Sequence, residues 1–253
     1  MAVDHCHSVS HVQPVSPIAY TRWRSTSLGQ ITESLEQKRL LQLAGDVVGK
    51  RVLEIGCGDG ELLRRLVSDG ADVTGIDVDQ NMLTVAIAKA PNARILRANA
   101  CSLPFEADTF DLVFANTVLC LVPDRNIALT EAYRVLRPGG QLIVGELGLW
   151  SLWALIRRVK GALGSQLWRH AHFVTRRSLT IEFEQVGLTP VTCRGSVYYP
   201  PCGLAARLLA PLDIWLGQMT TFGAAYIGAV AEKPGPQKQT MPLADRQQKS
   251  KPP

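Results

Sequence analysis

Short apolar runs alternate with amphipathic segments through most of the chain. Five runs are rich in the branched apolar residues typical of buried strands. They span residues 51–55, 71–77, 93–98, 110–116 and 140–147. Helical patterns lie between them at residues 61–68, 80–90 and 124–136. The last of these helices is expected to stop at Arg137-Pro138-Gly139-Gly140, because proline ends a helix and glycines turn the chain.

The segments outside this central pattern complete the expected architecture. A helical pattern at residues 31–43 precedes the first strand and predicts an N-terminal cap. A helical insert at about 148–174 precedes a helix at 175–186 and two strands at 188–198 and 222–231. The sequence therefore predicts a Rossmann-like α/β fold. Its seven-stranded, mostly parallel sheet has helices on both faces and an insert after the fifth strand.

Length and composition fit one domain. The chain has 253 residues, 46% of them hydrophobic and 19% charged, which leaves little for a second core. We expect the domain to span residues 18–234, between a disordered N-terminal segment at 1–17 and a disordered basic tail at 235–253. The last twenty-two residues hold five Lys/Arg and two Asp/Glu, or +3 of the net charge of +5. Because the charge lies largely in the tail, we expect no nucleic-acid partner.

Cysteines and apolar stretches bear on where the protein works. The six cysteines form no CxxC pair and the chain shows no signal peptide, so we expect a reduced, cytoplasmic protein. Residues 5–11 hold three histidines and a cysteine but little apolar content, which predicts disorder and no metal site. The stretches 142–156 and 204–230 are interrupted by charges and glycines, so no transmembrane helix is predicted. Peripheral membrane contact stays open.

The stretch VLEIGCGDGELL, residues 52–63, predicts a strand, a tight turn and a helix. Its glycines form G-x-G-x-G, whereas a dinucleotide-binding turn, G-x-G-x-x-G, would have its third glycine where this chain has Glu61. Glu54 lies in the strand just before the turn. A carboxylate there would repel a diphosphate but can accept hydrogen bonds from an ammonium group. The loop therefore favours a cationic, nucleotide-like ligand.

Four segments in order resemble the class I S-adenosylmethionine-dependent methyltransferases, in the small-molecule branch that includes ubiquinone and menaquinone C-methyltransferases. They are VLEIGCGDG, GIDVDQNML, LPFEADTFDLVFANTVLCLVPD and EAYRVLRPGGQLIVGE. The resemblance covers roughly residues 20–234. It implies S-adenosyl-L-methionine as the cofactor and methyl transfer as the activity.

The resemblance also implies how the cofactor is held. Gly56, Cys57 and Gly58 would pass beneath its methionine part. Glu54 would face the amino group or order the loop. Asp77 would accept both ribose hydroxyls, a bidentate arrangement that suits a carboxylate at a strand end.

The adenine ring would lie among the residues that follow the second and third strands. Val78 and Met82 would sandwich the ring, although both side chains also suit ordinary core packing. Asn99 stands where relatives often have an aspartate, and its amide oxygen can still accept the adenine amino group. Ala100 and Cys101 would border the adenine edge.

The residues nearest the chemistry are less closely specified. Asn116 would lie at the mouth of the fourth strand. The string YTRWRSTSLGQ resembles the lid of these relatives, so Tyr20 and Trp23 would close over the cofactor, or would pin a terminal helix to the domain. Tyr20, His170 and His172 are candidate catalytic residues, and a general base is not required for every acceptor.

The predicted insert bears on the acceptor. Residues 147–181 contain six Lys/Arg, three tryptophans and no acid. On a helical wheel Trp150, Trp153, Arg157 and Lys160 share one face, which suits a membrane interface or an anionic amphiphile. The alternative is a lid helix buried on both sides.

Three functions stay open at this stage. The first is methyl transfer to a small, apolar or lipid-like acceptor. The residues after the fourth strand lack the Asn/Asp-Pro-Pro-aromatic sequence of amino-group methylases, so nucleic-acid bases are not expected. The second is a module that binds S-adenosylmethionine without catalysis. The third is a nucleotide-cofactor oxidoreductase, which Glu54 and Glu61 disfavour.

Overall fold

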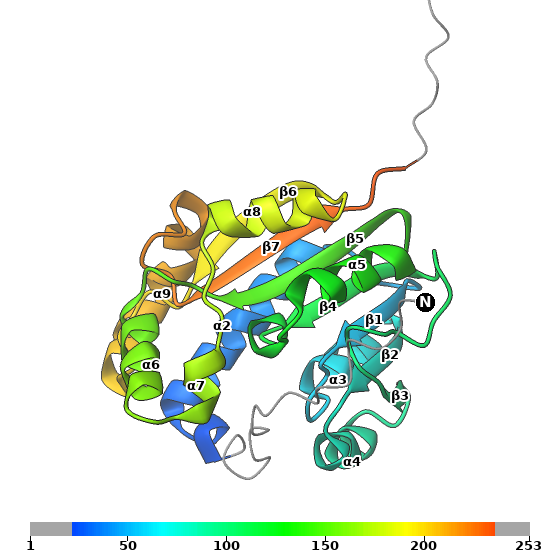
Figure 1. Ribbon diagram of the computed structural model, residues 1–253. Helices are drawn as coiled ribbons and strands as arrows, with labels where there is room; N and C mark the ends of the chain where they lie inside the picture. Colours follow the sequence, from blue (N-terminus) through cyan, green and yellow to red (C-terminus); the bar gives the residue numbers. More distant parts are fainter. Residues whose placement is uncertain (1–21, 236–253) are drawn as a thin grey trace, which may run out of the picture.

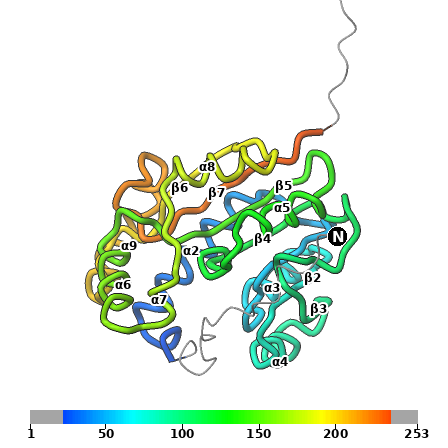
Figure 2. Tube along the Cα trace, in the orientation of Figure 1, coloured from blue at the N-terminus to red at the C-terminus, as the bar shows by residue number. Residues whose placement is uncertain are grey.

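The computed structural model describes residues 22–235, and a seven-stranded sheet lies at its centre (Figures 1 and 2). The strand order is β3-β2-β1-β4-β5-β7-β6. Strands β1 to β5 run parallel, and β7 is antiparallel to both β5 and β6. The strands are β1 Arg51–Ile55, β2 Asp72–Asp77, β3 Arg94–Arg97, β4 Phe110–Asn116, β5 Leu136–Leu147, β6 Thr189–Ser196 and β7 Tyr226–Glu232. The predicted mostly parallel α/β fold is confirmed.

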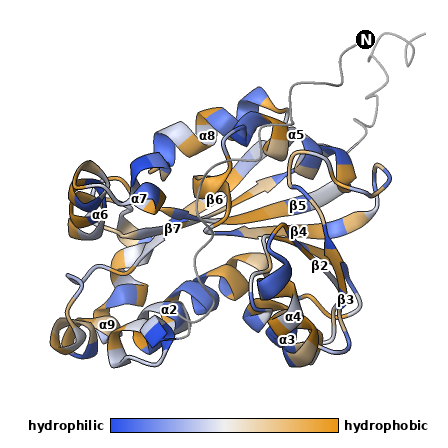
Figure 3. Ribbon diagram, turned by 60° about the horizontal axis from the view of Figure 1, so that its bottom comes forward, coloured by the Kyte–Doolittle hydropathy of each residue, from blue (hydrophilic) through white to orange (hydrophobic). Residues whose placement is uncertain are grey.

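Helices cover both faces of this sheet (Figure 3). Helices α5 and α8 pack on one face, and α2, α3 and α9 pack on the other. The described helices are α2 Ser27–Ala44, α3 Glu61–Ser68, α4 Gln80–Lys89, the 3-10 turn η1 Leu119–Leu121, α5 Arg125–Val135, α6 Leu152–Ala162, α7 Gln166–His170, α8 Arg176–Gln185 and α9 Gly203–Met219. The predicted insert after β5 contains α6 and α7.

The central strands read as continuous apolar runs because both of their faces are buried. In β4, Leu112 and Phe114 belong to the core beneath α2 and α3, whereas Val113 and Ala115 belong to the core beneath α5 and α8. Side chains alternate between the faces of a strand, so a strand covered on both sides needs apolar residues at successive positions.

The N-terminal cap begins earlier than the sequence predicts. Helix α2 starts at Ser27, where the side chain of Thr26 accepts the backbone N–H of Gly29 at 3.0 Å. A Cβ on Gly29 would lie 2.2 Å from the carbonyl oxygen of Trp23, so glycine allows residues 22–24 to fold back onto the helix. The hydroxyl of Thr32 is 3.0 Å from that of Tyr199, which fixes α2 against the C-terminal half.

Two C-terminal features differ from the sequence prediction. Strand β5 includes Arg137-Pro138-Gly139-Gly140, the expected turn, because Leu136 already pairs with Phe110 and a bulge absorbs the irregularity. The sequence pattern predicts no helix where the structure has α9. This helix contains Pro211, and its exposed side is largely apolar, so it lacks the polar face that marks an amphipathic helix. Within residues 22–235, no helix combines the length and apolar character needed to cross a bilayer.

The sheet topology creates one favoured place for a ligand. Strand order reverses between β1 and β4, because β1 leads outward to β2 and β3 while β4 leads to β5. Loops that leave the carboxyl ends of these two strands diverge to opposite sides of the sheet. Ligands of open α/β sheets bind in the crevice outside such a switch point.

Candidate cofactor site

The loop after β1 turns sharply at three glycines. Gly56, Gly58 and Gly60 have φ angles of 70°, 52° and 80°, in the left-handed region that glycine adopts without strain. Between them, the N–H of Cys57 donates to the carbonyl of Ile76 at 2.9 Å, so the loop stays attached to β2. Helix α3 then begins directly after Gly60.

The three glycines face different surroundings. A Cβ on Gly56 would lie 2.3 Å from Val118 Cγ2, and one on Gly60 would lie 2.9 Å from the Cα of Ala86. A Cβ on Gly58 would have no neighbour within 4 Å. The loop is therefore tightly packed on two sides and open beside Gly58, where a ligand can approach the backbone.

Asp77, at the end of β2, lies beside this opening. One carboxylate oxygen accepts the N–H of Gly58 and the other accepts the N–H of Asp79, both at 2.9 Å. These bonds fix the orientation of the carboxylate, and each oxygen keeps a lone pair for a ligand. The position and the free acceptor capacity fit the ribose-binding role that the resemblance implies.

Glu54 lies beneath the glycine loop and is only 3% exposed. Its Oε2 has no hydrogen-bond partner in residues 22–235. Burial, followed by the negative charges of Asp77 and Asp59, raises the pKa of Glu54 well above its usual value. A cationic donor would hydrogen-bond to this oxygen and would offset the cost of burying the charged carboxylate.

Asp59, inside the loop, is held by two cations. Its Oδ2 accepts Lys89 Nζ at 2.5 Å and also pairs with Arg24, which in turn pairs with Glu33 of α2. Although burial acts to raise it, these cations hold the pKa of Asp59 below its usual value. The N-terminal cap is thus tied to the glycine loop. Sequence analysis missed Arg24, although it lies in the YTRWRS string that resembles a lid.

The residues predicted around the adenine differ in how exposed they are. Val78 is 59% exposed next to Asp77 and offers an apolar surface at the crevice. Met82 and Ala100 are buried, so they form the floor of the region. Asn99 is exposed, and its Oδ1 accepts the N–H of half-buried Cys101 at 3.0 Å.

Asn116 marks the carboxyl end of β4. Its Oδ1 accepts the hydroxyl of buried Tyr226 at 2.8 Å. Gly145 makes room for this contact, because a Cβ there would lie 1.8 Å from the tyrosine oxygen. The next residue, Thr117, has a φ of 50°, which is unusual for a branched side chain.

Of the remaining candidates, the structure describes Trp23, His170 and His172. Trp23 is half-buried in the turn before α2. His170 is exposed at the end of α7. Tyr20 and the histidines of residues 5–11 lie outside the described residues. In residues 22–235, no three His, Cys, Asp or Glu side chains are grouped so that they could hold a metal ion.

The prediction that Trp150, Trp153, Arg157 and Lys160 share one exposed face is wrong for Trp153 and Arg157. Trp153 is buried, and its indole N–H donates to the carbonyl of Tyr199 at 2.8 Å. The guanidinium of Arg157 lies between the rings of Trp153 and Trp168, 5.0 and 4.8 Å from their centroids. Tryptophan and arginine turn inward because both gain partners there, while Trp150 and Lys160 remain exposed.

The inward side of α6 faces α2. Arg157 interacts electrostatically with Glu36, whose pKa burial raises to about 7 despite that attraction. It also interacts with Cys120 of η1, at the carboxyl edge of the sheet. The inward side of the insert therefore lies close to α2.

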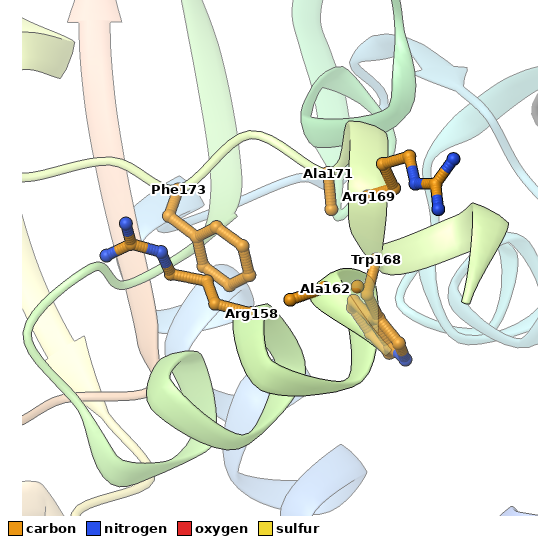
Figure 4. A pocket seen from close by; sticks show the side chains of 7 residues that line it. Arg158, Ala162, Trp168, Arg169, Ala171 and Phe173 are labelled. Atoms are coloured by element: carbon orange, nitrogen blue, oxygen red, sulfur yellow. The ribbon is translucent and has the colours of Figure 1, made fainter. Parts of the chain in front are cut away.

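A shallow pocket of about 270 Å³ lies on the insert itself (Figure 4). Helices α6 and α7 approach closely there, because a Cβ on Gly161 would lie 2.8 Å from the carbonyl oxygen of Trp168. The lining residues are Arg158, Gly161, Ala162, Trp168, Arg169, Ala171 and Phe173. None of the predicted cofactor residues lines this pocket.

A polar cluster, largely buried except at His172, lies where β5 ends. Arg125 of α5 donates to Glu146 at 3.3 Å and to Glu182 of α8 at 2.7 Å. His172 Nε2 lies 3.6 Å from Glu182, and the backbone N–H of His172 donates to the carbonyl of Cys120 at 2.8 Å. Burial and Arg125 lower the pKa of His172. Among the candidate catalytic residues, His172 therefore lies near the carboxyl ends of the parallel strands.

Glu146 is the most deeply buried member of the cluster. It is 0% exposed, and its Oε2 has no hydrogen-bond partner in residues 22–235. Burial raises its pKa from 4.5 to about 7, although Arg125 opposes the shift. Sequence analysis missed Glu146, because it continues a buried strand and its partners come from later helices.

The pKa of Glu146 predicts how stability depends on pH. Between pH 4.5 and 7 the unfolded chain loses this proton while the folded chain keeps it, so the free energy of unfolding falls as pH rises. Glu146→Gln should remove up to about 3 kcal/mol of that fall, since one pKa unit is worth about 1.4 kcal/mol. Urea denaturation at pH 4.5 and pH 8 measures the difference.

A second carboxylate provides a control of opposite sign. Arg134 holds the pKa of Glu131 below its usual value, so this group adds stability as pH rises through its titration. Below pH 4.5 the wild type should therefore lose stability on acidification more steeply than Glu131→Gln, while the fall between pH 4.5 and pH 8 should be nearly the same in both. If Glu146→Gln and the wild type have the same pH dependence, Glu146 has an ordinary pKa.

Comparisons with known proteins agree with this geometry. Residues 53–144 match a family model described as a methyltransferase domain. A demethylmenaquinone methyltransferase of Staphylococcus aureus is 37% identical over 116 residues, which cover 44% of this chain and 48% of that protein. The chain thus spans about half the length of the curated relatives it matches.

Solved structures extend the likeness to the whole sheet. A methyltransferase of Thermotoga maritima has a TM-score of 0.66 at 20% identity and covers 85% of this chain and 94% of its own. A geranyl diphosphate methyltransferase, solved with geranyl diphosphate and sinefungin, has a TM-score of 0.59 at 18% identity and covers 81% and 82%. Residues 53–144 therefore match a methyltransferase domain, and the described residues have the fold of solved methyltransferases.

Proposed function

We propose that this chain transfers a methyl group from S-adenosyl-L-methionine to a small, apolar or lipid-like acceptor in the cytoplasm or at the membrane periphery. The observation that carries the proposal is the unpaired carboxylate oxygen of Glu54, buried beneath the glycine loop. An amino acid ammonium satisfies that oxygen, whereas a diphosphate would be repelled by it. The matched domain in residues 53–144 supports the same cofactor.

The described residues fit each part of the cofactor. Gly58 leaves space for the backbone to approach the methionine part, and Glu54 faces its ammonium group. Asp77 has free lone pairs for the ribose hydroxyls, and exposed Val78 offers a surface for the adenine. When bound, S-adenosylmethionine supplies an electrophilic methyl group on a sulfonium.

The protein's own contribution is then positioning and the exclusion of water. Because the cofactor carries the driving force, the chain has to align the acceptor along the carbon–sulfur axis and keep water away. Helix α6 is placed to close the acceptor side, since Trp153 bonds to Tyr199 and Arg157 faces Glu36. Glu146 and His172 are the candidates for removing a proton where the acceptor requires it.

Two observations support an apolar or lipid-like acceptor. The Staphylococcus aureus relative is named for demethylmenaquinone, an apolar quinone, and the 37% identity lies in under half of each chain. The insert that closes the acceptor side contains three tryptophans and no acid. Both favour an apolar or anionic amphiphile over a small cationic metabolite.

Two alternatives predict different measurements. A non-catalytic module would bind S-adenosylmethionine without turnover, which is compatible with the fold because a fold hosts many functions. An oxidoreductase would bind NADH, which the carboxylates Glu54 and Glu61 oppose at the glycine loop. Calorimetry with both cofactors separates the oxidoreductase from the other two.

Turnover tests the proposal directly. The protein should convert S-adenosylmethionine to S-adenosylhomocysteine when demethylmenaquinone or a bacterial lipid extract is supplied, with one methyl group added to the acceptor. Liquid chromatography with mass spectrometry measures both products. Tight binding of the cofactor with no turnover on the extract or the quinone would favour the non-catalytic module.

Gly58→Ala should abolish most cofactor affinity without unfolding the domain. The new methyl group would enter the open space that a ligand fills, and Gly139→Ala is a matched control with a φ of 77° and equally open surroundings. Both variants should lose about 1 to 2 kcal/mol of stability, because alanine is strained in left-handed backbone. Only Gly58→Ala should weaken binding, and equal affinities in calorimetry would contradict the assignment of the glycine loop.

Asp77→Asn should weaken cofactor binding by roughly tenfold to a hundredfold, since charge-assisted hydrogen bonds contribute about 1.5 to 3 kcal/mol each. Asp79→Asn is its control, because that side chain caps α4 by accepting the N–H of Asn81 at 2.8 Å. The control should leave both affinity and thermal stability nearly unchanged, because asparagine caps a helix about as well as aspartate. An Asp77→Asn variant with wild-type affinity would show that the ribose is held elsewhere.

A further inference from the structure

Helices α6 and α9 expose an unusual number of large apolar side chains. Surface leucines and aromatics are ordinary when scattered, but rows of them along helices mark a binding surface. On α6 and just before it, the exposed residues are Trp150, Leu152, Leu155, Val159 and, after its end, Leu163. On α9 and just after it, they are Leu204, Leu208, Leu209, Leu212, Trp215, Met219 and Phe222.

The row on α9 follows one side of the helix. Leu204, Leu208, Leu212, Trp215 and Met219 are separated by four, four, three and four residues, which is helical spacing. A row of this kind would normally face a core. Here it faces outward, so the described chain gives it no apolar partner.

The orientation of α9 is fixed by its other side. Buried Asp213 accepts the N–H of Tyr198 at 3.0 Å. A Cβ on Gly217 would lie 2.1 Å from the carbonyl oxygen of Gly195, so the helix presses directly against β6. Rotation of α9 to hide its leucines would break both contacts, and the apolar row is therefore held outward.

The orientation of α6 is fixed in the same way. Trp153 and Ala154 are buried, and the indole of Trp153 bonds to the carbonyl of Tyr199, three residues before the N-cap of α9. This bond links the two helices at one end of the molecule (Figures 1 and 3). The same end holds the carboxyl edge of the parallel strands, where the crevice opens.

The exposed charged residues of these two helices are all positive. Helices α6 and α9 contain a single acid, Asp213, and it is buried. Their exposed charged residues are Arg158, Lys160 and Arg207. Apolar rows flanked by cations complement an anionic lipid surface, where the apolar side chains enter the acyl boundary and the cations meet headgroups.

We propose that the outer faces of α6 and α9 form the surface by which this protein docks on an anionic bilayer. A second copy of the chain is the less favoured occupant, because a symmetric interface would bring the same cations together. The proposal deepens the proposed function and rests on it for the acceptor, which would reach the crevice from the membrane side. Docking itself is measured without turnover.

Cosedimentation with vesicles tests the surface. The full chain should bind vesicles of phosphatidylglycerol and phosphatidylcholine, and should bind pure phosphatidylcholine at least about tenfold more weakly. Binding to the anionic vesicles should decrease as salt increases. The double variant Leu208→Glu, Leu212→Glu should lose at least about tenfold in vesicle binding while keeping its affinity for S-adenosylmethionine.

A matched control separates the surface from a general effect of added acids. Val48 and Val191 are 67% and 55% exposed, close to the 67% and 52% of Leu208 and Leu212. They lie near the amino ends of β1 and β6, at the opposite edge of the sheet from the crevice. The double variant Val48→Glu, Val191→Glu should bind vesicles like the wild type.

Three outcomes would overturn the proposal. The wild type could ignore anionic vesicles, the two double variants could bind them equally, or the surface could hold a second copy. In the last case sedimentation without lipid would show a dimer that Leu208→Glu, Leu212→Glu dissociates. Retained S-adenosylmethionine affinity and turnover on a detergent-dispersed quinone, measured in parallel, would show that the proposed function stands even if docking fails.

Discussion

The cofactor site depends on Glu54, a buried carboxyl group whose Oε2 has no hydrogen-bond partner within residues 22–235. Glu54 lies in β1, two residues before Gly56 of the glycine loop, and Asp77 and Asp59 add further negative charge. Lys89 and Arg24 balance Asp59, whereas Glu54 forms no ion pair within the described residues 22–235. A site of this kind selects a ligand with a positive group beside a nucleoside, and it opposes one with a diphosphate in the same place.

Much of this site could be predicted from the sequence, because its parts are local. Gly58 and Asp77 come directly after strands whose apolar runs are continuous, and parallel strands bring their carboxyl ends to one edge. The resemblance supplied the roles. Glu146 and Arg24 could not be predicted in this way, since their partners are distant in the chain and no periodicity links them.

The C-terminal helices show where pattern reasoning fails. The sequence pattern predicts no helix at α9 and leaves the inward face of α6 open, because a pattern shows which residues share a face but not which face turns inward. On α6 that choice is made by Trp153, whose indole finds a carbonyl, and by Arg157, which finds two rings and an acid. These specific interactions, and not the burial of leucines, determine which side of α6 faces inward.

Proton release on cofactor binding tests the role of Glu54 most directly. If Glu54 is protonated in the free protein and pairs with the ammonium group, binding near neutral pH should release up to one proton per cofactor. Calorimetry of S-adenosylmethionine binding in buffers of different ionisation enthalpy measures that number. The account predicts a release that disappears in Glu54→Gln. Proton uptake, or the same release in wild type and variant, would contradict it.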